Sequence, residues 1–254
     1  MNNKNLCKYK KYKTNTYNIG GPGEFEIAEF IAEKMSLKKG KKLIDIGCCQ
    51  GFQTCFLAKE YGVNVVGIDP GGVLGEIPYG IETLMAYARV LGIEDNIVGI
   101  KTSLPESLLP SNCFDYAYST NCLEMIRGNS GTDGYLAALS EIYRILKNGG
   151  LFGLAEPMCK DLKILDMPIS EYIMEPYKEY GFDKCFVTIE ETVKAVGEAG
   201  FKILDYGYNE ESYRWWQDHV SSLDADDICR KNIELMNDSG WLSFGYIISI
   251  KDIN

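Results

Sequence analysis

The chain has 254 residues, of which 46% are hydrophobic and 24% charged, a composition typical of a globular protein with one large core. Its formal net charge of −10 repels phosphate groups, so we expect no nucleic-acid partner. The sequence has no apolar run near the roughly 18 residues of a membrane span, no apolar secretion signal at its N-terminus, and nine scattered cysteines without a CxxC pair. These features predict a reduced, cytoplasmic protein without a membrane partner.

Short apolar runs separated by helical patterns extend over most of the chain. The apolar runs predict strands at residues 42–46, 63–68, 96–101, 114–119, 151–155, 201–206 and 241–250. The helical patterns lie at residues 24–35, 51–61, 79–91, 133–146 and 188–199. We expect the run Asn148-Gly149-Gly150 to stop the helix over residues 133–146, because glycine can take the left-handed conformation there. Strands that alternate with helices in this way predict an α/β protein with a parallel, doubly wound sheet.

Two stretches depart from this alternation. Residues 158–184 are irregular, and residues 210–239 have the pattern of two helices between two predicted strands. Insertions at the carboxyl ends of parallel strands commonly cover the ligand crevice. We therefore expect a solvated N-terminal arm over residues 1–23, followed by a single domain over residues 24–254 in which both stretches form a lid.

The most informative segment is LIDIGCCQGF at residues 43–52, whose pattern predicts a strand, a tight glycine loop and the start of a helix. Glycines let the backbone approach a ligand closely, and the free N–H groups of a helix start attract negative charge. Asp69 ends the next predicted strand, where a carboxylate can accept both hydroxyls of a ribose. The sequence therefore predicts a ligand that contains a nucleoside.

A nicotinamide cofactor is disfavoured by the same loop. The dinucleotide pattern GxGxxG needs glycine where this chain has Cys49 and Phe52, and a side chain at position 52 crowds the contact between helix and strand. Tyr180 and Lys184 have the Tyr-x-x-x-Lys spacing of short-chain dehydrogenases, although Gly181 weakens a helix between them. A nicotinamide-dependent reductase is therefore a less favoured alternative.

Four segments resemble the motifs of class I S-adenosylmethionine-dependent methyltransferases. Residues 45–51 (DIGCCQG) resemble motif I, D-x-G-x-G-x-G; residues 67–70 (GIDP) resemble the acidic motif of the second strand; residues 114–119 (FDYAYS) resemble the FD motif; and residues 144–150 (RILKNGG) resemble R-x-L-K-x-G-G. The helical insertion before a final strand led by tryptophan is similar to small-molecule enzymes of the methyltransferase type 11 and phosphoethanolamine N-methyltransferase group.

The resemblance implies a Rossmann-like fold, with a seven-stranded, mostly parallel sheet, helices on both faces and a helical lid. It also implies S-adenosyl-L-methionine as cofactor, S-adenosyl-L-homocysteine as product, and in-line methyl transfer to a small-molecule acceptor by a monomer or homodimer. Such transfer depends mainly on positioning, because the sulfonium is already activated.

The match to motif I indicates which residues are expected to contact the methionine end of the cofactor. Gly47 and Gly51 are expected to line it, and Asp45 to support the loop and approach the ammonium group. Cys49 stands at the middle glycine of motif I, a position that a cysteine can occupy if its φ stays negative.

The same matching indicates which residues are expected to contact the nucleoside end of the cofactor. Asp69, with Pro70 beside it, is expected to hold the ribose, and Ser103 and Leu104 to lie beside the adenine. Asn121, just past the fourth strand, is expected near the methyl-bearing sulfonium.

Two residues are candidates for catalysis on the acceptor side. His219, the only histidine, is a candidate general base near neutral pH or, alternatively, a polar residue on an amphipathic lid helix. Glu156, which follows the fifth predicted strand, is expected to point toward the crevice or to be a buried structural carboxylate.

Candidate acceptor contacts come from three parts of the chain. Trp215 and Trp216 are expected either to enclose a cationic or planar acceptor or to anchor the lid in the core. Glu124 lies beyond the fourth strand as a substrate contact or lid hinge, and Tyr12 and Tyr17 are candidates to close over the cofactor.

The cysteines suggest one further alternative. Arsenite methyltransferases, which resemble this chain in fold, have metalloid-binding thiols near the positions of Cys122 and Cys185. A third ligand would have to be Cys7 or Cys159. The competing interpretation is that these cysteines are buried and inert, and we predict no metal site.

Overall fold

The computed structural model describes residues 8, 12, 21–74, 76–160, 178, 181–222 and 241–252. Its elements in chain order are α1 (Glu24–Met35), β1 (Lys42–Ile46), α2 (Phe52–Tyr61), β2 (Asn64–Asp69), β3 (Gly72–Leu74), β4 (Ile77–Tyr79), α3 (Ile81–Leu91), η2 (Glu94–Asn96), β5 (Ile97–Lys101), β6 (Phe114–Thr120), α4 (Leu123–Ile145), β7 (Leu146–Cys159), α6 (Phe182–Cys185), α7 (Ile189–Glu198), β8 (Phe201–Tyr208), α8 (Ser212–Ser222) and β9 (Leu242–Lys251). The sequence did not predict the β3–β4 hairpin or the short helices η2 and α6.

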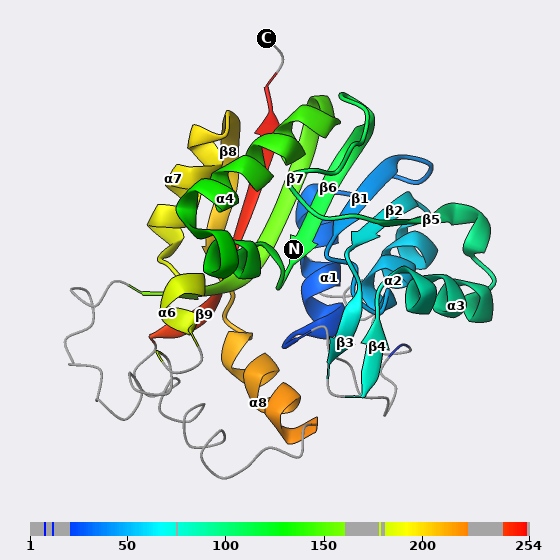
Figure 1. The fold of residues 1–254 in the computed structure, drawn as a ribbon, viewed down its shortest axis with the longest axis horizontal. Coiled ribbons are helices and arrows are strands. Elements are labelled where there is room, and N and C mark those ends of the chain that lie inside the picture. The colour runs from blue at the N-terminus through cyan, green and yellow to red at the C-terminus, as the bar shows by residue number, and fades with distance from the viewer. Residues whose placement is uncertain are drawn as a thin grey trace.

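Seven strands form one sheet in the order β5-β2-β1-β6-β7-β9-β8 (Figure 1). Neighbours run parallel except β9, which is antiparallel to both β7 and β8. The strand order reverses at β1, because the chain first proceeds outward to β2 and β5 and then returns to β6 on the other side. Ligands of open α/β sheets bind at such a reversal, outside the carboxyl ends of the strands. The predicted seven-stranded, mostly parallel sheet is confirmed.

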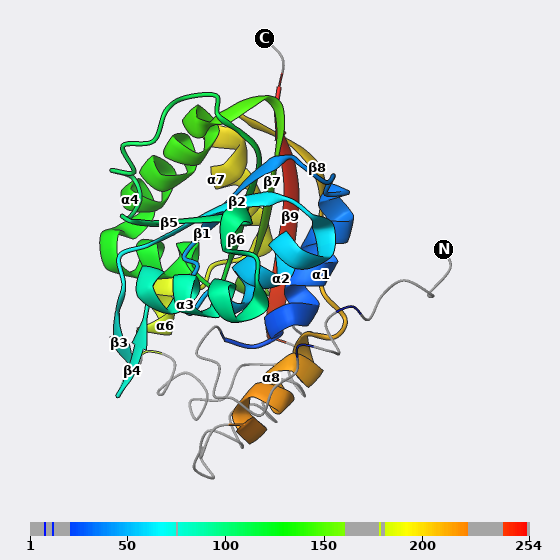
Figure 2. The same ribbon diagram turned by 90° about the vertical axis from the view of Figure 1, so that its right-hand side faces the viewer.

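Helices cover both faces of the sheet. α1, α2 and α3 pack beside one another along one face, and α4 and α7 pack on the other. Figure 2 shows α4 and α1 on opposite sides of the strands. Buried apolar side chains form one cluster under each layer, with Ile31 and Phe56 in the first and Leu139 and Val196 in the second. Among the helices of the described ranges, none is long and apolar enough to cross a membrane.

α4 differs from the helix predicted over residues 133–146. It begins at Leu123, and Gly131 (φ 68, ψ −170) interrupts it, so that two helical segments join at a kink. It ends before Leu146, which is extended, and the expectation that Gly149 ends this helix is therefore wrong. Gly149 does have a left-handed φ of 76, but it lies inside β7.

The N-terminal arm is not fully solvated. Tyr12 is only 6% exposed. Its ring packs against Phe25 and Phe56, and its hydroxyl donates a 2.5 Å hydrogen bond to Oε1 of Glu60. Tyr12 therefore fastens the arm to α1 and α2, and it does not close over the cofactor loop.

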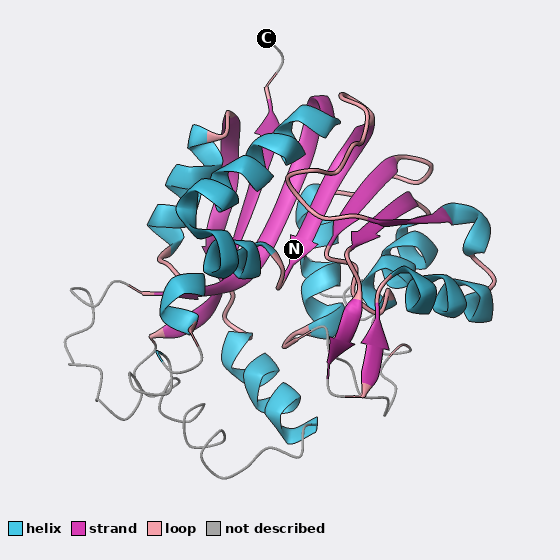
Figure 3. Ribbon diagram, in the orientation of Figure 1, coloured by secondary structure: helices cyan, strands magenta, loops and turns pink. Residues whose placement is uncertain are grey.

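Three elements lie beyond the carboxyl ends of the parallel strands, namely the β3–β4 hairpin, α6 and α8 (Figures 1 and 3). α8 corresponds to the first of the two helices predicted within residues 210–239. The second helix, and most of the other predicted lid stretch at residues 158–184, fall outside the described residues.

The start of α7 supports a stability prediction. Thr188 forms a capping box with Glu191, in which each side chain accepts a hydrogen bond from the other residue's backbone N–H. Replacing such a cap by alanine removes a partner of an otherwise free N–H group. We expect Thr188→Ala to lower the free energy of unfolding by about 1 kcal/mol in urea titrations. The exposed helix variant Lys194→Ala should change it by less than about 0.5 kcal/mol; equal effects of the two variants would contradict the prediction.

Candidate cofactor and acceptor site

The loop between β1 and α2 approaches α4 too closely to accommodate a side chain at Gly47. Gly47 has a φ of 79, and its N–H donates a 2.9 Å hydrogen bond to the carbonyl oxygen of Ile68 on β2. A Cβ atom here would overlap the side chain of Cys122, which precedes α4. Gly51 has a φ of 83 before α2, and a Cβ there would overlap Leu84. Both motif glycines are therefore required by packing as well as by backbone conformation.

Cys49 departs from its expected backbone conformation. Its φ is 50, so the expectation of a negative value is wrong. The left-handed region costs a non-glycine residue about 1–2 kcal/mol. In this conformation the N–H of Cys49 donates to Oδ2 of Asp69 at 2.9 Å, and its carbonyl oxygen accepts the N–H of Gly80 at 2.9 Å. Burial and the negative charge of Asp69 raise the pKa of the thiol to about 12, so it remains protonated.

Asp69 joins the loops that follow β1 and β2. Besides the bond from Cys49 to Oδ2, its Oδ1 atom accepts the N–H of Gly71 at 2.7 Å. The side chain is 5% exposed, at the wall of a cavity. Each carboxylate oxygen has two lone pairs, so each retains one that can accept a hydroxyl group of a ligand.

Asp45 lies beneath the loop instead of in the cavity wall. It is 3% exposed, and Oδ2 accepts a 2.5 Å hydrogen bond from Oγ1 of Thr54, which ties β1 to α2. Burial raises the pKa of Asp45 to about 7, opposed by the hydrogen bond from Thr54 and reinforced by the charge of Asp69. The side chain therefore supports the loop, as predicted; its approach to a ligand ammonium group stays a prediction.

Two adjoining cavities, of about 550 and 460 Å³, lie at the carboxyl ends of β1, β2 and β6. The larger is bounded by the β1–α2 loop, the start of α4, and side chains of α6 and α8. The smaller is bounded by the ends of β1 and β2, β4, and residues 102–104. Both share a wall made of Gly47, Cys49, Asn121 and Met125.

The cavities bring together all the predicted cofactor positions except Asp45. One or both are lined by Gly47, Cys49, Gly51, Asp69, Pro70, Ser103, Leu104 and Asn121. Asn121 stands where the two spaces meet, with a φ of 51, and its Nδ2 donates to the carbonyl oxygen of Pro22 at 3.4 Å. Pro22 and Gly21 also line the larger cavity, so the end of the N-terminal arm belongs to the site.

Three predicted acceptor-side residues also lie in the wall of the larger cavity, namely Glu124 on α4 and Trp216 and His219 on α8. Burial lowers the pKa of His219, which favours a neutral imidazole at neutral pH. Burial raises the pKa of Glu124 well above its usual range, and the negative charge of Glu156 raises it further.

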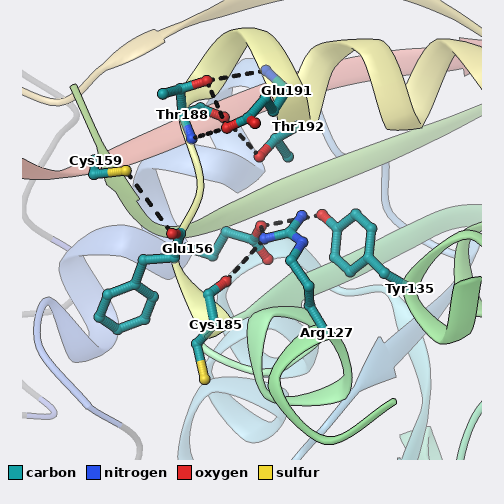
Figure 4. Close-up of polar contacts among 9 residues, drawn as sticks. Arg127, Tyr135, Glu156, Cys159, Cys185, Thr188, Glu191 and Thr192 are labelled. Carbon is teal, nitrogen blue, oxygen red and sulfur yellow. Dashed lines mark hydrogen bonds and ion pairs between the residues drawn. The ribbon is translucent and has the colours of Figure 1, made fainter. Parts of the chain in front are cut away.

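Glu156 lies inside β7, not after it, and its side chain is fully buried (Figure 4). Its Oε1 atom accepts hydrogen bonds from Nη1 of Arg127 at 3.3 Å and from the hydroxyl of Tyr135 at 3.0 Å. Arg127 also donates to the carbonyl oxygen of Cys185 at 3.0 Å, and its guanidinium lies over the Tyr135 ring at 3.6 Å. The expectation that Glu156 points into the crevice is corrected, because Arg127 and Tyr135 hold it within a buried network; its alternative, a buried structural carboxylate, fits.

Trp215 belongs to the core. It is 4% exposed, packs against Phe244 with ring centroids 5.9 Å apart, and donates from Nε1 to Oε2 of Glu26 at 2.9 Å. The expectation that it contacts the acceptor is therefore corrected, whereas its role as an anchor of α8 fits the structure. Tyr17 lies outside the described residues.

Several cavity residues escaped the sequence analysis. Gln53 lines the larger cavity, and its Oε1 accepts hydrogen bonds from the hydroxyls of Tyr118 and Thr120 at 2.9 and 2.7 Å. Its place just after the motif glycines was the available signal. Phe182 and Phe186 also line this cavity, but their stretch of sequence carried no periodic pattern, so nothing indicated them.

The arsenite alternative has no third ligand within the described residues, where no group of three or more His, Cys, Asp or Glu side chains could share a metal ion. Burial raises the pKa of Cys122 and of Cys185, and the charge of Glu124 adds to both shifts. Cys7 lies outside the described residues.

The Tyr-x-x-x-Lys spacing at residues 180–184, on which the reductase alternative depends, spans the start of a short helix. Gly181, with a φ of 72, precedes the start of α6. Lys184 lies in α6, whereas Tyr180 lies outside the described residues.

Comparison with known proteins is consistent with this geometry. Residues 44–154 match the family model described as a methyltransferase domain. The recognition of methyltransferase motifs is thereby confirmed.

Two curated proteins show the range of similar sequences. Sterol 24-C-methyltransferase erg6 of Aspergillus fumigatus is 28% identical over 69% of this chain and 43% of its own length. Phosphoethanolamine N-methyltransferase 1 of Arabidopsis thaliana is 29% identical over 63% of this chain and 29% of its own. The chain thus spans less than half the length of these relatives.

A solved structure shows the shared fold. Geranyl diphosphate C-methyltransferase from Streptomyces coelicolor A3(2), in complex with Mg²⁺, geranyl diphosphate and S-adenosyl-L-homocysteine, superposes with a TM-score of 0.69 at 15% identity. The similarity covers 88% of this chain and 78% of that one. At this level of identity, the likeness establishes the fold of the domain.

Gly47 and Gly40 provide a matched test of the close approach to α4. Both have a φ of 79, but a Cβ at Gly47 would overlap Cys122, whereas a Cβ at Gly40 has no described atom within 4 Å. We therefore expect Gly40→Ala to lower the free energy of unfolding by the cost of backbone strain alone, about 1–2 kcal/mol. We expect Gly47→Ala to lower the free energy of unfolding by a further 1–3 kcal/mol or so through overpacking, measured by denaturant titration. Equal losses in the two variants would show that the overlap is relieved without cost.

Asp45 predicts a pH dependence of stability. Its pKa rises from about 3.9 when unfolded to about 7 when folded, so the folded state binds the proton more tightly. The stability from this group is present at low pH and is lost as the pH rises through about 7. We expect the wild type to lose roughly 2–4 kcal/mol relative to Asp45→Asn between pH 5 and pH 8.

Asp115→Asn is the control for this measurement. Burial raises the pKa of Asp115, but hydrogen bonds from the Lys42 N–H and from Lys147 outweigh that effect and lower it overall. Asp115 therefore titrates below pH 5, and Asp115→Asn should show the same change of unfolding free energy with pH as the wild type. If Asp45→Asn also showed the wild-type change, the prediction would be contradicted.

Proposed function

We propose that this chain is an S-adenosyl-L-methionine-dependent methyltransferase that acts on a small-molecule acceptor. The observation that carries the proposal is the pair of adjoining cavities with Gly47, Cys49, Asn121 and Met125 in their common wall. One space offers a carboxylate for a ribose, and the other extends from the glycine loop to an apolar, aromatic surface. A nucleoside joined to an amino acid, with an acceptor beside it, fits this arrangement.

The residues of the smaller cavity suit the nucleoside. Asp69 presents one free lone pair on each carboxylate oxygen to the ribose hydroxyls. Leu104, which is 7% exposed, and Tyr79 supply apolar surface for the adenine. The methionine end belongs at Gly47 and Gly51, because only a residue without a side chain leaves room there.

The bound cofactor supplies a methyl group on a positively charged sulfur. The protein then has to hold the acceptor in line with that methyl group and exclude water. Asn121 marks the place of transfer, since it lines both cavities. His219 faces the same larger cavity, and its neutral imidazole is a candidate to accept a proton from an acceptor.

The names of the relatives support a small molecule as the acceptor class, since they include a sterol and a phosphoethanolamine methyltransferase. The proposed partner is therefore a metabolite, and no comparison points to a macromolecule. A cytoplasmic location, a single domain over residues 24–254, and a monomeric or homodimeric state stay predictions from the sequence.

Calorimetry with S-adenosyl-L-homocysteine tests the cofactor assignment. We expect micromolar binding by the wild type and no binding of NAD or NADP. Asp69→Asn removes the charge that strengthens the ribose hydrogen bonds, so we expect its affinity to fall roughly tenfold to hundredfold. Asp95→Asn, an exposed aspartate of η2, should bind like the wild type. Binding of a nicotinamide cofactor in place of S-adenosyl-L-homocysteine would overturn the proposal.

Transfer itself is tested with cofactor labelled in the methyl group and an extract of host metabolites. We expect label in a product that is one methylene heavier than a metabolite of the extract. A protein that binds S-adenosyl-L-homocysteine tightly but labels nothing in such extracts would be a binding protein instead of an enzyme.

A further inference from the structure

A buried carboxyl group with one unpartnered oxygen atom faces the larger cavity. Glu124 lies in the first turn of α4, is 4% exposed, and lines this cavity. Its Oε2 atom is buried and has no hydrogen-bond partner among the described residues. Buried polar atoms in folded proteins are nearly always hydrogen-bonded, so an orphaned oxygen at a cavity wall indicates a ligand group.

The charges around Glu124 favour a cation as that group. The nearest described cation, Arg127, is engaged by Glu156 at 3.3 Å and by the carbonyl oxygen of Cys185 at 3.0 Å. One guanidinium therefore stands beside two buried carboxyl groups and can neutralise one of them. The other is either protonated, as the raised pKa of Glu124 favours in the free protein, or paired with a cation from a ligand.

The other walls of the cavity are suited to a cation with an apolar body. Phe52, Phe182, Phe186 and Trp216 all line it, and aromatic ring faces attract positively charged nitrogen. The rings of Phe182 and Phe186 are stacked at 5.0 Å between centroids. Trp216 also carries a buried Nε1 atom with no partner among the described residues, and its N–H group can donate to a polar group of the ligand.

We propose that the acceptor is an amine with an apolar body, and that Oε2 of Glu124 binds its nitrogen and takes up its proton. This inference rests on the proposed methyl transfer and assigns the acceptor class of the same site. Arg127 and Tyr135 act as positioning residues, because they hold Glu156 in place (Figure 4), and the charge of Glu156 acts on Glu124.

The proton transfer explains why the carboxyl group is buried. An ammonium nitrogen has no free electron pair and cannot accept a methyl group. When the N–H bond breaks and an O–H bond forms at Oε2, the nitrogen keeps the electron pair, and the negative charge of Glu124 is neutralised. An exposed carboxylate is too weak a base for this step, whereas burial and the nearby Glu156 raise the proton affinity of Glu124.

The same charges discriminate against phosphorylated acceptors. Among the described residues that line the larger cavity, Glu124 is the one acidic side chain, and none is Lys or Arg. A phosphate group placed here would meet an acidic group without a compensating cation. We therefore expect an amine acceptor without a phosphate group.

Three probes with one carbon skeleton test the inference, namely 2-phenylethylamine, 2-phenylethanol and 2-phenylethyl phosphate. Each is titrated calorimetrically into the protein loaded with S-adenosyl-L-homocysteine. We expect the amine to bind at least about tenfold more tightly than the alcohol, and the phosphate more weakly than either. In Glu124→Gln the preference for the amine should fall below about threefold, while the affinity for S-adenosyl-L-homocysteine stays unchanged.

Glu94→Gln, an exposed glutamate of η2 outside both cavities, is the matched control and should keep the full preference. The wild-type comparison of amine and alcohol stands even if Glu124→Gln fails to fold. Equal binding of the two probes, including binding of neither, overturns the inference, as does an amine preference that survives Glu124→Gln. Failure to bind S-adenosyl-L-homocysteine would instead refute the proposed function, so the two failures are distinguishable.

Discussion

The contact between the backbone of Gly47 and the side chain of Cys122 is the constraint on which the site depends. It brings the loop after β1 against the start of α4, with no space for a side chain between them. Glu124 follows two residues later on the same helix, so its position is set relative to the glycine loop. Methyl transfer requires reacting atoms about 3–3.5 Å apart, and a short, rigid connection of this kind defines such a separation better than a mobile loop.

Four buried carboxyl groups lie near this contact, and the structure stabilises each in a different way. Asp69 accepts two backbone N–H groups, Asp45 accepts the hydroxyl of Thr54, and Glu156 is paired with Arg127. Glu124 alone has an oxygen that the described residues leave unpartnered at the cavity. Because an unpaired buried carboxyl oxygen is unfavourable in the free protein, its presence at the cavity wall is better explained by binding than by folding.

The sequence identified most residues that line the two cavities near the glycine loop, because they come from contiguous segments. Gly47 and Asp69 follow adjacent parallel strands, and β-strand order alone places them side by side. Cys49 shows the limit, since the sequence could not reveal that hydrogen bonds to Asp69 and Gly80 hold its backbone in the left-handed region. For Glu156 and Trp215 the sequence left two alternatives open for a related reason, because only tertiary contacts decide whether a side chain near a strand or helix end faces the cavity or the core.

The acceptor side of the site is formed by elements that are distant in the sequence. Sequence similarity to known proteins says least about this side. The family match ends at residue 154, before α6, the residue that follows it, and α8. These segments contribute Phe182, Phe186, Trp216 and His219 to the cavity wall. Relatives named for a sterol and for phosphoethanolamine share the cofactor region, so that region does not decide the acceptor. The acceptor is selected where α4, α6 and α8 meet, and there the unpaired oxygen of Glu124 among aromatic rings is the feature that discriminates between one small molecule and another.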